Sequence, residues 1–311
     1  MAASPIFRRL ALIGVGLIGS SIARVVRREG IAAEIVGADI SASARSDLAE
    51  LGICERVVAD PAQAVRDADL VMICTPLGTY AEVGQAIAPH LAPGAILSDV
   101  GSVKQAVMRD LAPVVPDHIH FIPGHPIAGT EHSGPKAGFA ELFEGRWCIL
   151  TPPPGTDEAA VERLAELWRR AGSTVELMEP GHHDQVLAIT SHLPHLIAYT
   201  IVGTAFGLEE STRREVIKFS ASGFRDFTRI AASDPIMWRD IFLNNREAVL
   251  EMLSRFTEDL TALQRAIRWG EGEKLEDLFT RTRAIRRSII EAGQDTSAPN
   301  FGRLGSSPGG R

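Results

Sequence analysis

A histidine near the middle of the chain lies in a segment that suits proton transfer. His125 follows Pro123 and Gly124 and precedes Pro126, so its backbone is stiff and biased toward an extended conformation. An imidazole can take a proton at neutral pH. Two interpretations are open at this point. His125 is a general base, or it is a structural residue of a short turn that continues to Gly134.

A carboxylate and a hydroxyl complete this first group of candidates. Glu131, six residues after His125, either contributes to a pocket or closes the turn. Ser102 follows the apolar run 95–98 and precedes a helical pattern, where its oxygen can cap the helix. The same place would aim the hydroxyl at a ligand, and the two roles are compatible. We expect Lys104 to be a solvated helix residue.

Further histidines occur within the segment Ser191-His192-Leu193-Pro194-His195. His192 and His195, at positions i and i+3, share one face of a predicted helix. Because His182 and His183 are nearby, a metal site is one interpretation. Neither a cysteine pair nor an HExxH pattern accompanies these residues, so the sequence favours histidines that line a polar cavity, and no metal.

Two arginines four residues apart are candidates for binding an anion. Arg225 and Arg229 flank Asp226. A guanidinium can hold a carboxylate with two parallel hydrogen bonds. One of the two arginines can instead pair with Asp226 or Asp240, and the spacing does not decide which one binds a ligand.

A glycine-rich turn predicts a dinucleotide site. It follows the apolar run 10–13 and precedes a helical pattern, as phosphate binding at a helix N-terminus requires. Asp39, at the end of the next predicted strand, should accept hydrogen bonds from ribose hydroxyls and repel a 2′-phosphate, which favours NAD over NADP. The turn consists of Gly14, Val15, Gly16, Leu17, Ile18 and Gly19.

Short β-branched runs alternate with helical patterns over the first half of the chain, which is typical of a parallel sheet with crossover helices. Thr75 and Pro76 follow one such run, at the edge where open α/β sheets bind ligands. They either belong to the cofactor site or simply end the strand. The predicted strands are 10–13, 34–38, 70–74, 95–98, 119–122, 147–150 and 173–177, and the predicted helices are 17–30 and 158–171.

After Pro180 the strand-like runs stop and long helical patterns follow. They cover 182–207, with a break or kink at Pro194, then 234–269 and 273–292. We therefore predict an α/β protein with an N-terminal Rossmann-type parallel-sheet domain at residues 1–179, followed by an all-α C-terminal domain at 180–293. Residues 294–311, rich in Gly, Ser and Pro, are predicted to be a disordered tail.

The composition is that of an ordinary globular protein. The chain has 311 residues, a net charge of −7 and three cysteines. The sequence has no basic stripe with aromatic residues between, which argues against nucleic acid as a partner. We expect no membrane span, because no apolar stretch approaches the required length, and no signal peptide, because residues 1–9 are too short and too polar for one. The cysteines are far apart, so we expect buried free thiols and a cytoplasmic location.

Several motifs occur in an order that resembles the prephenate/arogenate (cyclohexadienyl) dehydrogenase family of tyrosine biosynthesis. The resemblance covers residues 10–292, and the combination is specific even though each motif alone is not. The motifs are Gly14-x-Gly16-x-x-Gly19-Ser20, Asp99-Val-Gly-Ser-Val-Lys104, Gly124-His-Pro-Ile-Ala-Gly-Thr-Glu131, Ser191-His-Leu-Pro-His195, Phe224-Arg-Asp-Phe-Thr-Arg229 and Asp234-Pro-Ile-Met-Trp238.

The resemblance implies NAD(P)-dependent oxidative decarboxylation of prephenate to 4-hydroxyphenylpyruvate, or of arogenate to tyrosine. It implies that His125 deprotonates the ring 4-hydroxyl as hydride leaves that carbon, that Ser102 orients the hydroxyl, and that Arg229 holds a substrate carboxylate. It also implies a homodimer formed through the helical domain. The rest of the pocket would be lined by Glu131, Ser191, His192, His195 and Trp238.

Two other functions compete with this one. A 3-hydroxyacid dehydrogenase or imine reductase also has a dinucleotide domain followed by helices, but such enzymes rely on a lysine of the helical domain. Lys218 is the nearest candidate and belongs to no matching motif. A non-catalytic NAD-sensing protein would tolerate loss of the base and of the arginine, whereas His125 and Arg229 are both present.

Overall fold

The structure of the chain is a computed structural model that describes residues 4–207, 215, 218–219 and 222–291. Contacts between residues divide the chain into two compact units, 1–252 and 253–311. The candidate site lies within the first unit. The disordered tail predicted at 294–311 lies outside the described residues.

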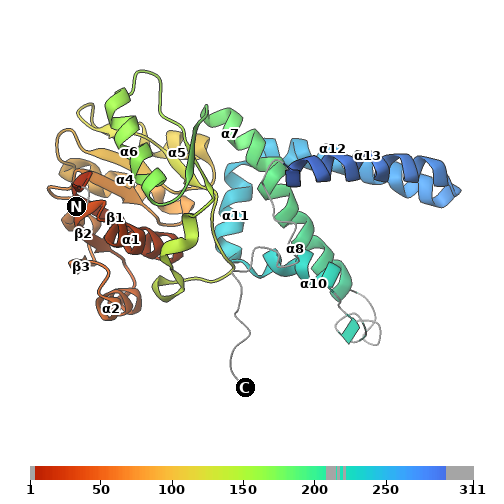
Figure 1. Cartoon of the computed structure of the whole chain (residues 1–311), viewed down its shortest axis with the longest axis horizontal. Coiled ribbons are helices and arrows are strands. Elements are labelled where there is room, and N and C mark those ends of the chain that lie inside the picture. Colours follow the sequence, from red (N-terminus) through yellow and green to blue (C-terminus); the bar gives the residue numbers. More distant parts are fainter. Residues whose placement is uncertain (1–3, 208–214, 216–217, 220–221, 292–311) are drawn as a thin grey trace. The chain divides into compact units, whose positions relative to one another are not determined.

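Six parallel strands form the central sheet of the first unit (Figure 1). Their order, β3-β2-β1-β4-β5-β6, is that of a Rossmann-type fold. The predicted parallel sheet is therefore confirmed, but the predicted strands 147–150 and 173–177 belong to a second sheet, and the short strand β3 was not predicted. The strands are β1 (Phe7–Ile13), β2 (Ala32–Ala38), β3 (Arg56–Val58), β4 (Leu70–Ile73), β5 (Ile96–Asp99) and β6 (His120–Phe121).

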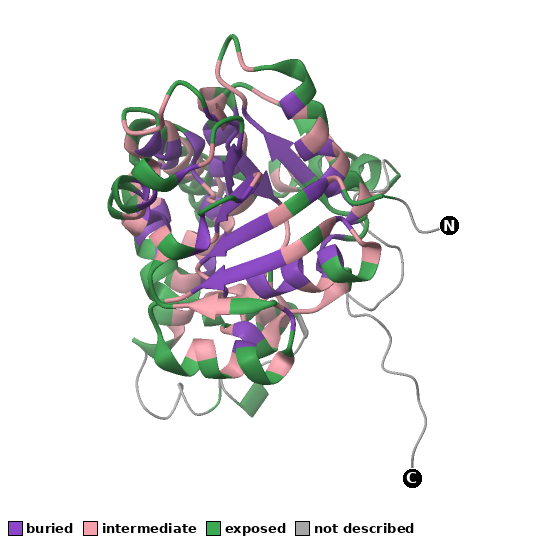
Figure 2. Ribbon diagram, turned by 90° about the vertical axis from the view of Figure 1, so that its left-hand side faces the viewer, coloured by how far each residue is buried: buried purple, intermediate pink, exposed green. Residues whose placement is uncertain are grey.

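Both faces of this sheet are buried. Leu10 and Leu12 of β1 belong to one apolar cluster, whereas Ala11 and Ile13 belong to another. Successive side chains of a strand point to opposite faces, so a strand covered on both sides needs a continuous apolar run. Figure 2 shows these central strands largely in purple, the colour of buried residues.

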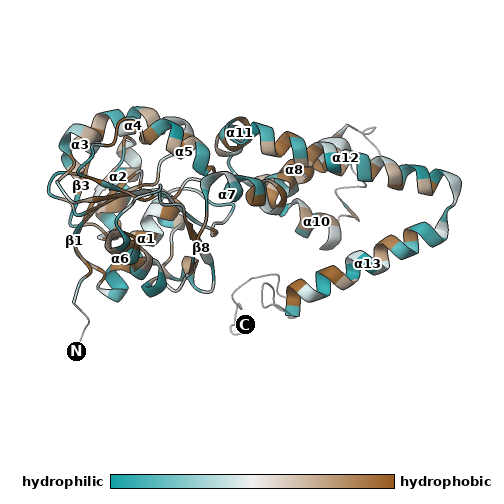
Figure 3. Cartoon of the chain, turned by 90° about the horizontal axis from the view of Figure 1, so that it is seen from above, coloured by the Kyte–Doolittle hydropathy of each residue, from teal (hydrophilic) through white to brown (hydrophobic). Residues whose placement is uncertain are grey.

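Helices cover the two faces of the sheet. Figure 3 shows α3, α4 and α5 on one side of the strands and α1 and α6 on the other. Accordingly, Val25 and Leu164 pack in the first apolar cluster, and Ile87 and Val107 in the second. The helices are α1 (Leu17–Glu29), α2 (Ala42–Leu51), α3 (Pro61–Ala64), α4 (Tyr80–Ile87), α5 (Lys104–Leu111) and α6 (Glu158–Arg170).

A second, three-stranded sheet carries the candidate base. Strand β7 (Gly124–Pro126) runs antiparallel to β8 (Trp147–Leu150), which is parallel to β9 (Thr174–Leu177). His125 is paired with Ile149. The prediction that His125 lies in a turn is therefore wrong. Its extended backbone, which Pro126 favours, is part of a strand.

The described residues after 179 are mainly helical, as predicted. The expected break at Pro194 is a π-helical turn, Ala188–His192, in which Leu193 N donates to Ala188 O. The predicted helix 234–269 is two helices, because α11 ends at Asn244 and α12 begins at Arg246. The helices are α7 (Pro180–Leu187), α8 (Leu193–Phe206), α10 (Ser222–Thr228), α11 (Pro235–Asn244), α12 (Arg246–Trp269) and α13 (Gly272–Glu291).

The expectation that no apolar stretch approaches the length of a membrane span is wrong for this region. The helical run 180–206 is long enough, with a mean hydropathy of 1.4, to cross a membrane by length and composition alone. The same run carries His183, Asp184 and His192, which are buried polar residues of the first unit. Their hydrogen bonds to α5, to β7 and to Asn245 attach the run to the rest of the first unit.

Candidate active site

The glycine turn between β1 and α1 has the shape of a dinucleotide site. Gly14 has a φ of +81°, and a Cβ there would lie 2.5 Å from Thr75 Cγ2. A Cβ on Gly19 would lie 2.8 Å from Gly14 O. Gly16, in contrast, has open space around it and stands at a helix N-terminus without a side-chain cap. Free amides beside open space are what a pyrophosphate requires, so the turn fits NAD.

Asp39 holds this turn in place. Its Oδ2 accepts a hydrogen bond from Val15 N at 3.1 Å, and its Oδ1 accepts one from Ser41 N at 2.9 Å. Arg45 donates to the backbone oxygens of Asp39 and Ile40, so its guanidinium is already engaged. A carboxylate at the end of β2 with an engaged arginine beside it suits a ribose diol better than a 2′-phosphate.

The turn after β4 meets the glycine turn. Thr75 backbone atoms lie within 3 Å of where a Gly14 Cβ would be, and Thr75 Oγ1 accepts a hydrogen bond from Thr79 Oγ1 at 2.8 Å. Pro76 is exposed and precedes a 3-10 turn, Leu77–Thr79. Thr75 therefore lies where the strand order of the sheet reverses, which is the ligand-binding edge of such folds.

A buried ion pair lies beneath the candidate base. Lys104 Nζ is 2.7 Å from Asp99 Oδ2, and neither side chain is exposed. Lys104 Nζ also donates to the backbone oxygen of Gly124, next to His125. Asp99 Oδ1 accepts from Gly124 N at 3.1 Å, so β5 and β7 are joined through these charges. The expectation that Lys104 is a solvated helix residue is wrong, because its side chain extends inward to a buried carboxylate.

Asp184, and not Ser102, caps the N-terminus of α5. The N-cap residue of α5 is Val103, which has no capping side chain. Asp184 Oδ1 accepts from Lys104 N at 2.7 Å and Oδ2 accepts from Gln105 N at 2.9 Å. The helix amides are therefore satisfied from α7, and the capping role proposed for Ser102 is wrong. Ser102 itself is half-buried beside α5.

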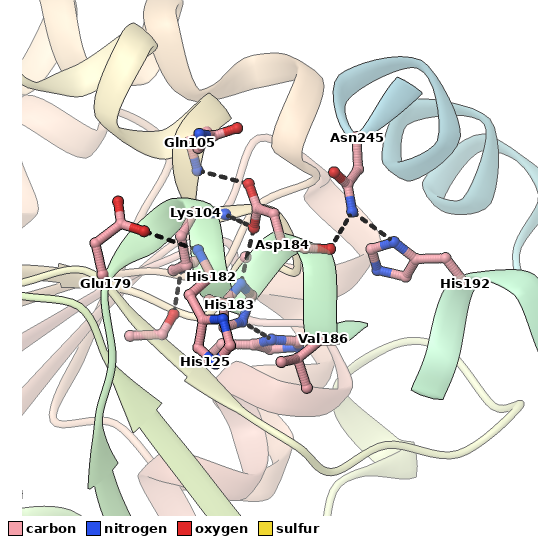
Figure 4. Close-up of polar contacts among 12 residues, drawn as sticks. Lys104, Gln105, His125, Glu179, His182, His183, Asp184, Val186, His192 and Asn245 are labelled. Carbon is pink, nitrogen blue, oxygen red and sulfur yellow. Dashed lines mark hydrogen bonds and ion pairs between the residues drawn. The ribbon is translucent and has the colours of Figure 1, made fainter. Parts of the chain in front are cut away.

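His125 is the first member of a hydrogen-bonded chain (Figure 4). His125 Nδ1 lies 2.9 Å from His183 Nε2, and His183 Nδ1 lies 2.8 Å from Asp184 Oδ1. The two imidazole rings meet edge to face, with centroids 5.1 Å apart. His125 is 8% exposed, and His183 is fully buried. An imidazole held in this way has a fixed orientation, which general-base catalysis requires.

The surroundings of His125 keep its imidazole neutral. Burial is the largest cause that holds the pKa of His125 well below its ordinary value of 6.5. The positive charge of Lys104 acts in the same direction, as do the charges that His183 and His192 would carry if protonated. At neutral pH the ring therefore carries a lone pair and can accept a proton.

His192 is held by Asn245 at the start of α12. Asn245 Nδ2 lies 3.0 Å from His192 Nδ1 and 2.8 Å from the backbone oxygen of Asp184. An amide N–H donates to both acceptors, so the proton of a neutral His192 lies on Nε2. That nitrogen is buried and has no hydrogen-bond partner within the described part of the chain. Burial lowers the pKa of His192 to about 4.

Trp238 of α11 connects the two histidines of the helical region. Its ring stacks on His195, with centroids 3.6 Å apart, and lies edge to face with His192 at 6.1 Å. His195 Nδ1 is 2.9 Å from the backbone oxygen of Ser191, so His195 Nε2 carries the lone pair of the neutral ring. Trp238 therefore contacts both His192 and His195, two of the residues that the resemblance assigns to one pocket.

Arg229 and Glu131 form an ion pair, with Nη1 3.0 Å from Oε2 and exposed fractions of 49% and 29%. The pKa of Glu131 is lowered, first by a backbone hydrogen bond and then by the charge of Arg229. Burial is the largest cause that lowers the pKa of His195, and the charge of Arg229 acts in the same direction. Arg225 instead lies 3.5 Å from Asp226, and 67% of its side chain is exposed.

Several buried residues of the site were not predicted from the sequence. The sequence indicates His183 only as a possible metal ligand, and it gives no signal for Asp184 or Asn245. A signal was present for Lys104, because it lies in the motif that begins with the strand-end residue Asp99. No group of three or more metal-ligating side chains occurs among residues that the structure describes.

Comparisons with known proteins agree with this geometry. The family model described as "Prephenate dehydrogenase, nucleotide-binding domain" matches residues 22–177, and "Prephenate dehydrogenase, dimerization domain" matches residues 179–281. The chain is 42% identical over 284 residues to a cyclohexadienyl dehydrogenase of Zymomonas mobilis. The aligned residues cover 91% of this chain and 97% of the relative.

Two solved structures are also similar. The crystal structure of prephenate dehydrogenase from Aquifex aeolicus with hydroxyphenyl propionate and NAD+ has a TM-score of 0.84 and 35% identity, covering 91% of this chain and 98% of that one. Synechocystis arogenate dehydrogenase has a TM-score of 0.76 and 27% identity, covering 90% of this chain and 99% of that one.

Proposed function

This chain belongs to the prephenate dehydrogenase family, and on that premise we propose that it catalyses the NAD-dependent oxidative decarboxylation of prephenate, arogenate or both. Relatives named for each of the two substrates have this fold. The two substrates differ by a keto or an amino group on the side chain. The proposed products are 4-hydroxyphenylpyruvate and tyrosine, respectively, each with carbon dioxide.

His125 is the proposed base. When bound, NAD supplies the nicotinamide that accepts hydride from ring carbon 4. His125 accepts the proton of the hydroxyl on that carbon while the hydride leaves, and Ser102 orients the hydroxyl. Loss of the ring carboxylate as carbon dioxide then leaves its electron pair in the ring, which becomes aromatic. Because the product keeps its ring hydroxyl, the proton that His125 accepted is returned.

Arg229 is the proposed clamp for a substrate carboxylate. It is half-exposed, and its one described ion pair is with Glu131, so a substrate carboxylate can share or replace that partner. Ser191, His192, His195 and Trp238 would line the rest of the pocket. Nε2 of His192 and Nε1 of Trp238 are buried and have no hydrogen-bond partner among the described residues, so they are two donors available to an oxygen of the substrate.

The observation that carries this proposal is the fixed, neutral imidazole of His125. It is hydrogen-bonded at Nδ1 and joined to the ligand-binding edge of the sheet through Gly124 and Asp99. A group that is oriented, neutral and at that edge needs only a correctly placed substrate hydroxyl to act as a base.

A purified His125→Asn variant tests the proposal. Reduction of NAD at 340 nm, with prephenate and with arogenate, should show turnover lowered by roughly 10²–10⁴-fold, the range for a lost general base. The dissociation constant for NAD should be unchanged, because His125 is not part of the glycine turn. His90→Asn, at an exposed histidine, is the matched control. Near-normal turnover of His125→Asn would show that the histidine is structural.

The same assay separates the alternatives. A hydroxyacid dehydrogenase or imine reductase would need a lysine of the helical domain in the pocket, whereas Lys218 is exposed and lies over the Phe219 ring. Wild-type protein that binds NAD but turns over neither prephenate nor arogenate would be an NAD-sensing protein instead.

The helical region is the proposed dimerisation surface, with a domain boundary between residues 179 and 180 and the helical domain extending to 293. Figure 3 shows apolar residues in brown along α8 and α11. Ile201, Phe206 and Ile236 are large apolar side chains that are exposed in the single chain. Association of two copies would cover such side chains. Light scattering should give twice the mass of the chain. The proposed location of the protein is the cytoplasm.

A further inference from the structure

We propose that His183 and Asp184 are positioning residues that determine which nitrogen of His125 accepts the proton, so that Nε2 is the basic atom. The proposal rests on the proposed role of His125 as the base. Histidine exists in two neutral forms, and only the form with a lone pair toward the substrate can act as a base. The identity of the protonated nitrogen is set by the hydrogen bond that the other nitrogen makes.

Asp184 is one end of the hydrogen-bonded series that runs through His183 to His125. Its Oδ1 lies 2.7 Å from Lys104 N and 2.8 Å from His183 Nδ1, and its Oδ2 lies 2.9 Å from Gln105 N. Both backbone N–H groups can only donate, so the carboxylate is an acceptor at both oxygens. His183 Nδ1 must therefore carry a proton, because a lone pair there would face an oxygen lone pair at hydrogen-bond distance.

The position of the proton on His183 determines the position of the proton on His125. With its proton on Nδ1, a neutral His183 has its lone pair on Nε2, which lies 2.9 Å from His125 Nδ1. His125 must then donate from Nδ1, and the lone pair of His125 lies on Nε2. If His183 were doubly protonated, its Nε2–H would point at His125 Nδ1 and reverse the tautomer. Burial, the largest cause, lowers the pKa of His183 below its ordinary value and keeps the ring neutral.

The surroundings hold this hydrogen-bonded series of side chains in place. Asp184 is 1% exposed, and its backbone oxygen accepts a hydrogen bond from Asn245 Nδ2 at 2.8 Å. The carboxylate therefore serves two purposes: it caps α5 and orients His183 (Figure 4). Capping alone would need no imidazole at position 183. It is His183 that connects the capped helix to the candidate base.

A spectroscopic measurement tests the tautomer without reference to activity. In protein labelled with ¹⁵N-histidine, long-range ¹H–¹⁵N correlation spectra at pH 8 distinguish protonated from unprotonated ring nitrogens. The signals of His125 are those that His125→Asn lacks. We expect Nδ1–H with an unprotonated Nε2 for His125 in the wild-type protein. An Nε2–H tautomer of His125 would overturn the proposal, even if every variant at His183 failed to fold.

A matched pair of variants at position 183 tests the consequence for catalysis. His183→Gln places an amide oxygen near the position of Nε2, where it can accept the proton of His125 Nδ1, whereas His183→Leu has no acceptor. We expect kcat to fall about 10²-fold in His183→Leu, within the range for general-base catalysis, and to stay within about 10-fold in His183→Gln. His182→Leu, the same change at the adjacent histidine, is the control.

The two proposals fail in different ways. Wild-type kcat in His183→Leu would overturn the positioning role, and an unchanged NAD affinity in that variant is expected because the glycine turn is elsewhere. Near-normal kcat in His125→Asn, with the Nδ1–H tautomer present in the wild-type protein, would instead overturn the role of His125 as base.

Discussion

Acid should destabilise this protein through its buried histidines, and His192 allows the effect to be calculated. Burial lowers the pKa of His192 from 6.5 to about 4. Protonation would also put a second donor opposite Asn245 Nδ2, which already donates to Nδ1. Between the two pKa values the unfolded chain binds a proton that the folded protein excludes, so stability falls as pH falls below 6.5.

The magnitude follows from these two pKa values. At pH 7 both states are mainly deprotonated at His192, and the contribution of the group to the pH dependence is a few tenths of a kcal/mol. At pH 4.5 the unfolded state is almost fully protonated and the folded state is mainly neutral. The free energy of unfolding should then be lower by about 2 kcal/mol on account of His192 alone.

Urea unfolding followed by tryptophan fluorescence, at pH 7 and at pH 4.5, measures this difference. His192→Asn keeps an oxygen near Nδ1 to accept from Asn245 but cannot be protonated, so its stability should fall by about 2 kcal/mol less than that of the wild-type protein over the same pH range. His90→Asn, at an exposed position, should keep the wild-type pH dependence. Equal pH dependence in His192→Asn and the wild-type protein would refute the assignment of the lowered pKa to His192.

The remaining predictions concern the cofactor turn, the substrate and the buried ion pair. Gly14→Ala should lower both stability, by more than about 1 kcal/mol, and NAD affinity, because an alanine would be left-handed and would clash with a neighbouring backbone. Gly16→Ala should lower NAD affinity alone, since its Cβ meets no protein atom; thermal melts with isothermal titration compare the two, and equal stability losses would contradict the difference. Arg229→Ala should raise the KM for substrate more than it lowers kcat in the 340 nm assay, and an unchanged KM would exclude this arginine as the clamp. Lys104→Met should lower the free energy of unfolding by about 3–5 kcal/mol in urea titrations, because it leaves the buried Asp99 carboxylate unpaired, and a loss below about 1 kcal/mol would mean that water reaches that carboxylate.

The sequence was sufficient to predict the class of fold because its signals are local. The alternation of apolar runs and helical patterns predicted the parallel sheet, and the glycine spacing predicted the turn at Gly14. Strand β7 was missed because three residues that follow one proline and end on another give no periodic pattern. The break at Asn245 was missed because the apolar pattern continues across it.

What the sequence by itself determined is the chemistry available: a histidine with a stiff backbone, a phosphate-binding turn, a ribose-binding carboxylate and two arginines. Only the tertiary structure decided how the histidine is held and which arginine meets Glu131. His125 and Asp184 are distant along the chain, and they approach because α7 packs against the N-terminus of α5. A tautomer depends on a few ångströms between such groups, a distance that no sequence spacing encodes.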